Sequence, residues 1–216
     1  MKKKQITGFL PLCRTEALER GWEQPDFVYV TGDAYVDHPS FGVSIISRVL
    51  AAEGFSVCII AQPDYHSAEA FREYGRPRLG FLVSSGNLDS MVANYTVAKR
   101  RRSYDYYSPG GKPGLRPDRA VIVYCNRIRE AYGDVPIIIG GLEASLRRCA
   151  HYDYWDDRVR NSILVDSGAD LLTYGMGENI MLRLAKLLDR GIPISKIRDL
   201  FNWDSFRSKI LCKGNL

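Results

Sequence analysis

One stretch in the middle of the chain limits the possible fold more than any other. Residues 135–148 are Val-Pro-Ile-Ile-Ile-Gly-Gly-Leu-Glu-Ala-Ser-Leu-Arg-Arg, an apolar run that ends in two glycines before a polar turn. A run without polar alternation is typical of a central parallel strand that helices cover on both faces. In open α/β sheets, ligands bind beyond the carboxyl ends of the strands. The pair Gly140–Gly141, which lets backbone approach another group closely, therefore marks the edge where we expect a site.

The chain as a whole has the composition of an ordinary globular protein. Its 216 residues are 45% hydrophobic and 25% charged, and the net charge is +5. This charge is mild and does not by itself indicate a nucleic-acid binder. No apolar run approaches the roughly 18 residues of a membrane span, and no signal-peptide core follows the basic Met1–Lys4. We therefore expect a cytoplasmic protein without a membrane partner.

The cysteines do not form a cluster. The five are tens of residues apart: Cys13, Cys58, Cys125, Cys149 and Cys212. Zinc sites, iron–sulfur clusters and disulfide frameworks show closer spacing, such as C-x-x-C. We expect buried free thiols and no metal site in this chain.

The apolar pattern predicts strands and helices in alternation. The predicted strands are 26–32, 55–61, 79–85, 135–139 and 169–175. The predicted helices are 41–53, 67–74, 91–98, 118–132 and a last one that ends at Gly191, while 159–165 fits either a strand or a helical turn. The alternation predicts an α/β fold, doubly wound and Rossmann- or flavodoxin-like, with a five-stranded, mostly parallel sheet in the order 2-1-3-4-5.

We divide the chain into three parts: an N-terminal arm (1–25), an α/β domain (26–191) and a C-terminal tail or linker (192–216). The domain contains an excursion rich in proline and glycine at 103–117. The tail mixes apolar side chains, including Leu200, Phe201 and Trp203, with charged ones. It should dock onto a surface.

Three loops should meet at the carboxyl edge of this sheet: 33–40, 84–88 and 140–145. In the first loop, Asp37 and His38 have the chemistry of a metal or cofactor site, because a carboxylate can orient an imidazole ligand. The alternative is structural: Ser40 caps the following helix, and Asp37 and His38 hydrogen-bond the loop.

The other two loops carry smaller side chains. Ser84, Ser85, Gly86 and Asn87 suit hydrogen bonds to a flat cofactor or a phosphate, although serine and glycine also simply end strands. Glu178 falls in the first turn of the last helix, where a carboxylate either contacts a ligand or only complements the helix dipole. No Gly-x-Gly-x-x-Gly follows a strand and no Gly-x-x-x-x-Gly-Lys occurs, which weakens dinucleotide and P-loop interpretations.

Two further segments have functional and structural interpretations. The basic run Lys99–Arg102, near Tyr104 and Tyr106, has the composition of a nucleic-acid surface. So short a run neutralises few phosphates, and a solvated C-terminal helix end, where cations suit the dipole, is the alternative. The segment His151–Trp155 is either an acid/base cluster or an aromatic contact with the core or a partner.

Several long motifs, in the right order, resemble the N-terminal region of YgiQ-type radical SAM proteins. They are Thr-Gly-Asp-Ala-Tyr-Val-Asp-His-Pro-Ser-Phe-Gly at 31–42, Ile-Ile-Ala-Gln-Pro-Asp at 59–64, Gly-Asn-Leu-Asp-Ser-Met at 86–91, Ile-Gly-Gly-Leu-Glu-Ala-Ser-Leu-Arg-Arg at 139–148 and His-Tyr-Asp-Tyr-Trp at 151–155. The resemblance extends from about Gly8 to Leu200. It implies a cobalamin-binding-like accessory domain of an iron–sulfur oxidoreductase.

Complete members of such a family have a radical SAM barrel after this domain. Its C-x-x-x-C-x-x-C loop holds a 4Fe-4S cluster that cleaves S-adenosylmethionine. This chain has no such loop. The resemblance therefore implies that cluster and S-adenosylmethionine belong to a complete member, that its own barrel is the partner of this domain, and that the chain alone is inactive.

The resemblance also implies a cofactor site. Cobalamin domains carry D-x-H-x-x-G after the first strand, a serine motif after the third and Gly-Gly after the fourth. The matching residues are Asp37, His38, Gly42, Ser84 or Ser85, and Gly140–Gly141, with the difference that His38 directly follows the aspartate. Two other functions stay open: a nucleic-acid-binding module that uses Lys99–Arg102, and a structural lid that binds no ligand.

Overall fold

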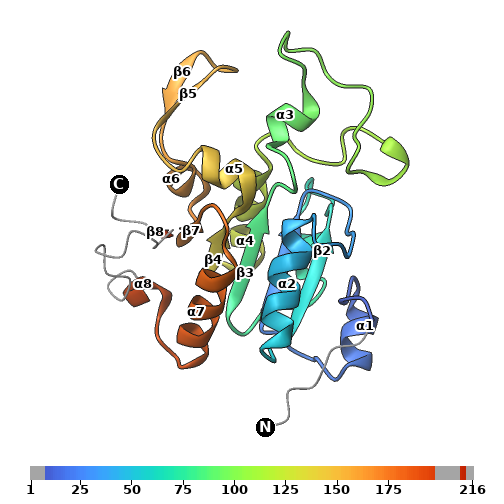
Figure 1. Cartoon of the computed structure of the whole chain (residues 1–216), viewed down its shortest axis with the longest axis vertical. Coiled ribbons are helices and arrows are strands. Elements are labelled where there is room, and N and C mark those ends of the chain that lie inside the picture. The colour runs from blue at the N-terminus through green and yellow to red at the C-terminus, as the bar shows by residue number, and fades with distance from the viewer. Residues whose placement is uncertain (1–7, 198–209, 213–216) are drawn as a thin grey trace.

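The computed structural model describes residues 8–197 and 210–212, which form a sheet with helices on both faces (Figure 1). The strands are β1 (Phe27–Thr31), β2 (Val57–Ala61), β3 (Gly80–Ser84), β4 (Ile137–Ile139), β5 (His151–Asp153), β6 (Arg158–Arg160), β7 (Leu171–Thr173) and β8 (Ile210–Cys212). The α-helices are α1 (Arg14–Glu19), α2 (Gly42–Ala52), α3 (Ser90–Asn94), α4 (Ala120–Tyr132), α5 (Gly141–Leu146), α6 (Ile163–Ser167), α7 (Glu178–Asp189) and α8 (Ile194–Ile197). Two short 3₁₀ helices are η1 (Glu69–Arg72) and η2 (Pro109–Gly111).

The main sheet has the strand order β2-β1-β3-β4-β7-β8. The first five strands are parallel, as the register pairs Phe27 with Val57 and with Gly80. This confirms the predicted doubly wound fold and its 2-1-3-4-5 order. A sixth strand, β8, pairs antiparallel to β7 and comes from the predicted tail. The tail positions Leu200, Phe201 and Trp203 lie outside the described residues.

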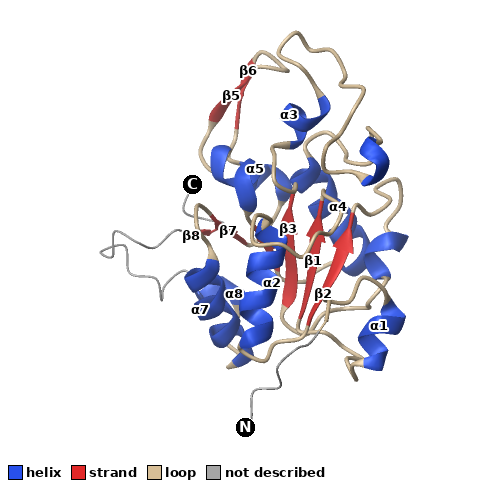
Figure 2. Cartoon of the chain, turned by 45° about the vertical axis from the view of Figure 1, so that its right-hand side comes forward, coloured by secondary structure: helices blue, strands red, loops and turns tan. Residues whose placement is uncertain are grey.

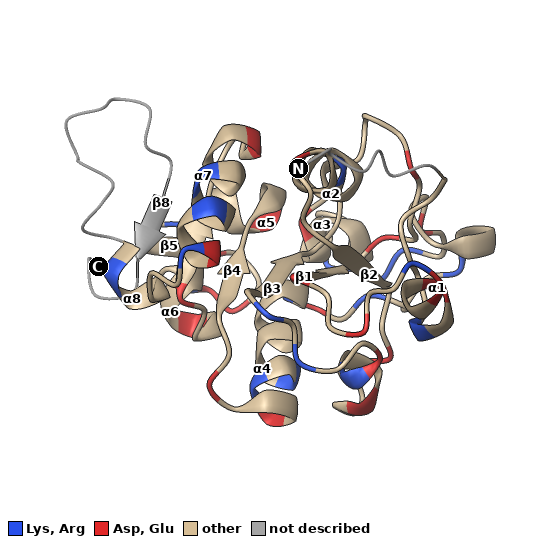
Figure 3. Ribbon diagram, turned by 90° about the horizontal axis from the view of Figure 1, so that it is seen from below, with Lys and Arg blue, Asp and Glu red and all other residues tan. Residues whose placement is uncertain are grey.

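Alternation along the buried strands divides the core into two halves. Val28 and Phe81 point to the face that α4 covers, while Tyr29 and Leu82 point to the face that α2 and α7 cover. Figure 3 shows these helices on opposite sides of the sheet. Strands buried on both faces lose the polar alternation, which is why the sequence shows continuous apolar runs.

The predicted helix at 91–98 is wrong in its second half. Helix α3 ends at Asn94, and Tyr95 is extended (φ −134°, ψ 153°) and pairs with Arg101 across an antiparallel bridge. The cause is Arg102, whose backbone N–H donates to the carbonyl of Asn94 at 2.8 Å. Its Nε donates to the carbonyls of Val92 and Tyr95, each at 3.1 Å. The basic run therefore lies on a turn beyond α3, and its Arg102 side chain bonds carbonyls at the C-terminal end of that helix.

Two excursions rise from the carboxyl edge of the sheet. The segment 95–117 leads from α3 to α4, and an antiparallel hairpin, β5–β6, lies between α5 and α6 (Figure 2). The ambiguous segment 159–165 contains both predicted structures, since it includes the end of β6 and the start of α6. Within the described ranges, no helix is long and apolar enough to cross a membrane.

Candidate functional site

The three loops predicted to meet at the carboxyl edge lie in contact. The backbone N–H of Asn87 donates to Asp33 Oδ2 at 2.6 Å, and its side-chain amide donates to the carbonyl of Ser40 at 3.3 Å. A Cβ built on Gly141 would lie 3.2 Å from Cβ of Ser84. These contacts join the loops after β1, β3 and β4 into one surface.

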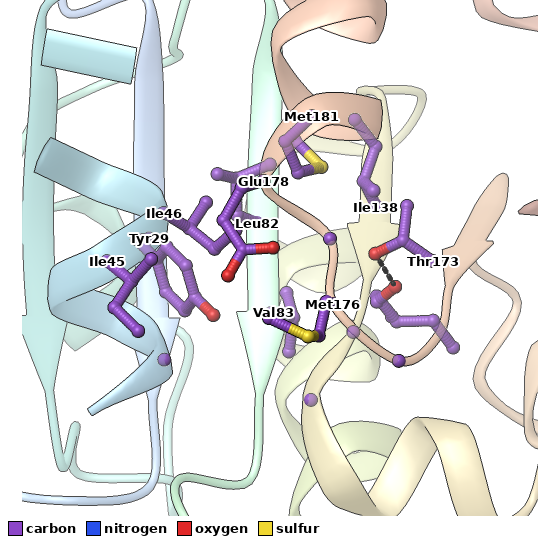
Figure 4. Close-up of a pocket in the computed structure, with 16 residues that line it drawn as sticks. Tyr29, Ile45, Ile46, Leu82, Val83, Ile138, Thr173, Met176, Glu178 and Met181 are labelled. Atoms are coloured by element: carbon purple, nitrogen blue, oxygen red, sulfur yellow. Dashed lines mark hydrogen bonds between the residues drawn. The ribbon is translucent and has the colours of Figure 1, made fainter. Parts of the chain in front are cut away.

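Beside this surface lies a cavity of about 290 Å³ between α2 and α7. Figure 4 shows its walls: Tyr29 from β1, Ile45 and Ile46 from α2, Met176 from the loop before α7, and Glu178 from the first turn of α7. The predicted residues Gly42, Gly140, Gly141 and Glu178 are among those that line it. We call this space the α2–α7 cavity.

The α2–α7 cavity is largely apolar, with a few polar groups at its walls. Tyr29 is buried, and burial raises the pKa of its hydroxyl, which therefore stays protonated. Thr173 Oγ1 donates to the carbonyl of Ile139 at 3.4 Å. Glu178 lies in the first turn of α7, as predicted, and its carboxylate points into the space between α2 and α7 (Figure 4). An apolar wall with a few converging polar groups is typical of a small-molecule site.

Two helices begin at this cavity without a side-chain cap. The N-cap residues are Phe41 for α2 and Gly177 for α7, and neither makes a side-chain capping bond. The predicted cap of α2 by Ser40 is therefore wrong, whereas the predicted structural hydrogen bonds of Asp37 and His38 are present. Uncapped first-turn N–H groups and the positive end of the helix dipole favour a negatively charged group nearby.

Gly140 and Gly141 allow the close approach that the sequence predicts. A Cβ on Gly140 would lie 2.9 Å from Thr173 Oγ1. Gly141 has φ +81°, a conformation that disfavours other residues. The pair thus brings the β4–α5 turn against β7 and the loop after β3, and it also leaves open space on the cavity side.

The other predicted site residues lie outside the cavity lining. Asp37 forms an ion pair with Arg48, whose hydrogen bond lowers the pKa of the Asp37 carboxyl. His38 is exposed, and its Nδ1 accepts the backbone N–H of Ser40 at 3.1 Å. Ser85 Oγ donates to the carbonyl of Leu88 at 2.7 Å. Asp37, His38 and the serine segment therefore have structural partners within the loops.

A fully buried guanidinium fixes the excursion 103–117 to the end of β1. Arg116 is 1% exposed, and it donates to Asp33 Oδ1 at 2.5 Å and to the carbonyl of Gly32 at 3.1 Å. Asp105 lies 3.5 Å from the same guanidinium. One cation therefore faces two buried carboxylates. Burial raises the pKa of Asp33 to about 6, although Arg116 and the N–H of Asn87 lower it and Asp105 adds to the rise.

Another buried carboxylate, on Glu143, joins three helices at this edge. Glu143, fully buried in α5, accepts the N–H of Ser90 at 2.8 Å and the N–H of Val121 at 3.2 Å. Burial raises the pKa of Glu143, and the charge of Asp89 raises it further. Asp89 caps α3 and forms an ion pair with Arg147. The sequence interpretation missed these residues, although a glutamate inside the apolar 135–148 motif could have indicated a buried partner.

The described residues contain no group of three His, Cys, Asp or Glu side chains placed to hold a metal ion. Cys58 and Cys125 are buried free thiols, as predicted, whereas Cys149 is exposed. A cofactor at the α2–α7 cavity would therefore be held by its shape, by the two helix starts and by Tyr29, Thr173 and Glu178. These groups fit a flat organic group, and an anion on it would accept backbone N–H groups at the start of α2, because the Glu178 carboxylate repels an anion at the start of α7.

The architecture and this edge define an open, doubly wound α/β domain. Over residues 9–209 the chain matches the family described as Radical SAM N-terminal. The chain belongs to this family.

Curated relatives are much longer than this chain. A UPF0313 protein of Clostridium perfringens (strain SM101) is 62% identical over 192 residues, which are 89% of this chain and 29% of that protein. A UPF0313 protein of Clostridium botulinum (strain Okra) is 60% identical over 192 residues, 89% of this chain and 30% of the relative. The chain thus spans under a third of the length of these relatives.

A solved structure has the same fold at low sequence identity. It is the radical S-adenosylmethionine methyltransferase TsrM from Kitasatospora setae, with tryptophan substrate and a SAM analogue bound. The TM-score is 0.50 at 16% identity, and the match covers 77% of this chain and 26% of TsrM. At this identity the likeness concerns the fold alone.

Proposed function

We propose that this chain is the accessory cofactor-binding domain of a YgiQ-type radical SAM iron–sulfur protein, and that its carboxyl edge faces the radical SAM barrel of the longer protein. Residues 26–191 would form the cofactor-binding part, and 192–216 would lead toward the barrel. The 4Fe-4S cluster and S-adenosylmethionine would be bound by the barrel. The family membership and the greater length of the relatives support this arrangement.

The α2–α7 cavity is the observation that carries the cofactor proposal. It lies at the switch point of the sheet, beyond the carboxyl ends of β1, β3, β4 and β7, where doubly wound domains bind ligands. Its lining includes Gly42, Gly140, Gly141 and Glu178, which lie at the starts of three separate helices, α2, α5 and α7. A volume of about 290 Å³ suits a heteroaromatic group of moderate size.

Cobalamin is the cofactor that we propose for this edge. Its nucleotide tail would enter the α2–α7 cavity, with its phosphate near the uncapped start of α2 and away from the Glu178 carboxylate, while the wider corrin would lie outside across Gly140–Gly141. Cobalamin carries the reactive chemistry when it is bound, and the protein supplies binding and orientation. The chain's own contribution would be an apolar slot that excludes water and backbone groups that fix the orientation.

Retention of cobalamin by the purified chain tests this proposal. The chain is incubated with hydroxocobalamin, desalted, and its visible spectrum is recorded. We expect retained absorbance at close to one cobalamin per chain. No retained absorbance at stoichiometric protein would contradict cobalamin binding.

A His38→Ala variant then tests whether this imidazole contacts the cobalt. The visible spectrum of cobalamin responds to its axial ligands, so loss of a ligand would shift the spectrum without abolishing retention. His66→Ala is the matched control, because His66 is an exposed histidine on the loop after β2 that is not in the cavity lining. An unchanged spectrum in His38→Ala would show that His38 has only its loop hydrogen bond.

A further inference from the structure

A second hollow, of about 440 Å³, lies above the carboxyl edge between the two excursions. One wall consists of residues 91–92, 95–97 and 102, which follow or belong to α3, and the other of residues 146–147 and 151–155, which end α5 and form the β5–β6 hairpin. Figures 1 and 2 show these two excursions above α5. We call this space the hairpin groove.

Direct contacts between its walls hold the hairpin groove in shape. Tyr154 donates its hydroxyl to the carbonyl of Val97 at 3.1 Å, and Lys99 Nζ donates to the carbonyl of Trp155 at 3.1 Å. The rings of Tyr95 and Trp155 pack at 4.2 Å between centroids. At the floor, Arg147 of one wall forms an ion pair with Asp89 of the other. The groove is therefore formed before any ligand enters.

Large apolar side chains border the groove and stay exposed. Val92 on one wall is 54% exposed, and Leu146 and Tyr152 on the other are 61% and 59% exposed. Tyr154 and Trp155 add aromatic surface. Contiguous exposed apolar surface of this kind often marks a binding site, and aromatic walls favour flat ligands.

The charged side chains that line the groove are two arginines, Arg102 and Arg147, and two carboxylates, Asp89 and Asp153. Its two carboxylates already have partners, because Asp89 pairs with Arg147 and Asp153 pairs with Arg119 and Arg160. Arg102 differs: its Nε donates to backbone carbonyls, but no described residue accepts a bond from its two terminal amino groups. Arg102 also has no carboxylate partner among the described residues, so an anion beside it would gain a charge-assisted hydrogen bond.

We propose that the hairpin groove is a second ligand site, which binds a small molecule with a flat apolar body and one anionic group, a carboxylate or a phosphate monoester. The apolar body lies between Val92 and the aromatic side chains of the hairpin, and the anion is held by the terminal amino groups of Arg102. Helix α5 connects the two sites, because Gly141 at its start lines the α2–α7 cavity and Leu146 at its end lines the groove. A helix of this length extends about 9 Å, so the two ligands would be neighbours. The proposal does not depend on cobalamin binding.

Three probes with the same aromatic body test this proposal on the purified chain. They are 2-naphthoate, 2-naphthyl phosphate and the neutral 2-naphthol, each titrated while the indole N–H resonance of Trp155 is followed by NMR. A Trp155→Phe variant assigns that resonance. We expect both anions to shift it and to bind roughly tenfold or more tightly than 2-naphthol. The tighter of the two anions shows which anionic group the groove prefers.

Matched variants separate charge from shape. Arg102→Met should remove the advantage of the anions, whereas Arg100→Met, at an exposed arginine of the same run that does not line the groove, should keep it. Val92→Trp should block all three probes, whereas Val36→Trp, also at an exposed valine, should not. Near-ultraviolet circular dichroism checks that each variant keeps its aromatic packing.

Several results would overturn the proposal. One is equal affinity for 2-naphthol and for both anions. Another is that Arg100→Met and Arg102→Met reduce the affinity for the anions by the same factor. Unchanged binding by Val92→Trp would show that the probes bind elsewhere. If none of the probes moves the Trp155 resonance, the groove does not bind this class of ligand.

Discussion

The two hollows at the carboxyl edge are built in opposite ways. The α2–α7 cavity is bounded by strand ends, glycines and two helix starts, and none of its described lining residues takes part in an ion pair. The hairpin groove is bounded by two excursions, which depend on ion pairs and on side chains that bond to distant backbone. Larger side chains in the lining should therefore weaken ligand binding in the α2–α7 cavity. Removal of a charged side chain should instead destabilise the two excursions that form the hairpin groove.

The largest loss of stability is expected when the buried guanidinium of Arg116, in the excursion 103–117, is removed. Arg116→Met removes the charge that faces Asp33 and Asp105 and leaves both carboxylates buried without it. Breaking a buried pair in this way costs about 3–5 kcal/mol. The measurement is the free energy of unfolding in urea. Arg100→Met, at an exposed arginine, should change it by less than about 0.5 kcal/mol. Equal stability of the two variants would show that the excursion does not depend on charge.

The pH dependence of stability tests the same network. Because the pKa of Asp33 is raised to about 6, the folded chain binds this proton more tightly than the unfolded chain. The stabilising effect is complete below the unfolded pKa and is lost as the pH rises through the folded pKa. Relative to Asp33→Asn, the wild type should thus lose roughly 2 kcal/mol of unfolding free energy between about pH 4.5 and about pH 7. A difference that does not change with pH would contradict the raised pKa.

A pair of glycines tests how closely the loop after β3 packs on this network. Gly86 has φ +103°, and a Cβ there would lie 2.0 Å from Asp33 Oδ1. Gly54 has φ +96°, but a Cβ built on it would meet nothing within 4 Å. Gly54→Ala should cost about 1 kcal/mol for the backbone alone, and Gly86→Ala about 1–3 kcal/mol more for the clash. Thermal or urea unfolding measures the stability of both variants. An equal loss of unfolding free energy would mean that the loop after β3 moves away from Asp33 without an energetic cost.

The smallest effect is expected at the far end of the hairpin groove. Tyr154→Phe removes the hydroxyl that bonds the carbonyl of Val97, which should cost about 0.5–1.5 kcal/mol locally. Amide hydrogen exchange in residues 95–101 should become faster. Tyr106→Phe is the control, because Tyr106 is 87% exposed. Similar exchange in the two variants would show that this contact does not hold the groove together.

The same contrast explains what could be predicted from the sequence. The five parallel strands and the close approach at Gly140–Gly141 were predictable, because an apolar run and a glycine pair are local features. Arg116 was missed because its partner Asp33 lies 83 positions away. The second half of the helix at 91–98 was predicted wrongly because Arg102 takes the carbonyls that would have continued it. Local periodicity contains no information on such side-chain contacts.

Filling the α2–α7 cavity gives the most direct test of the central claim. Gly42 lines the cavity, and a Cβ built on it meets nothing within 4 Å, so larger side chains there should leave the fold intact. The measurement is hydroxocobalamin retained per chain after desalting for the wild type, Gly42→Ala and Gly42→Trp. We expect the wild type and Gly42→Ala to retain cobalamin and Gly42→Trp to bind it at least tenfold more weakly, a loss of about 1.4 kcal/mol in binding free energy. Undiminished retention by a folded Gly42→Trp chain would contradict cofactor binding in this cavity.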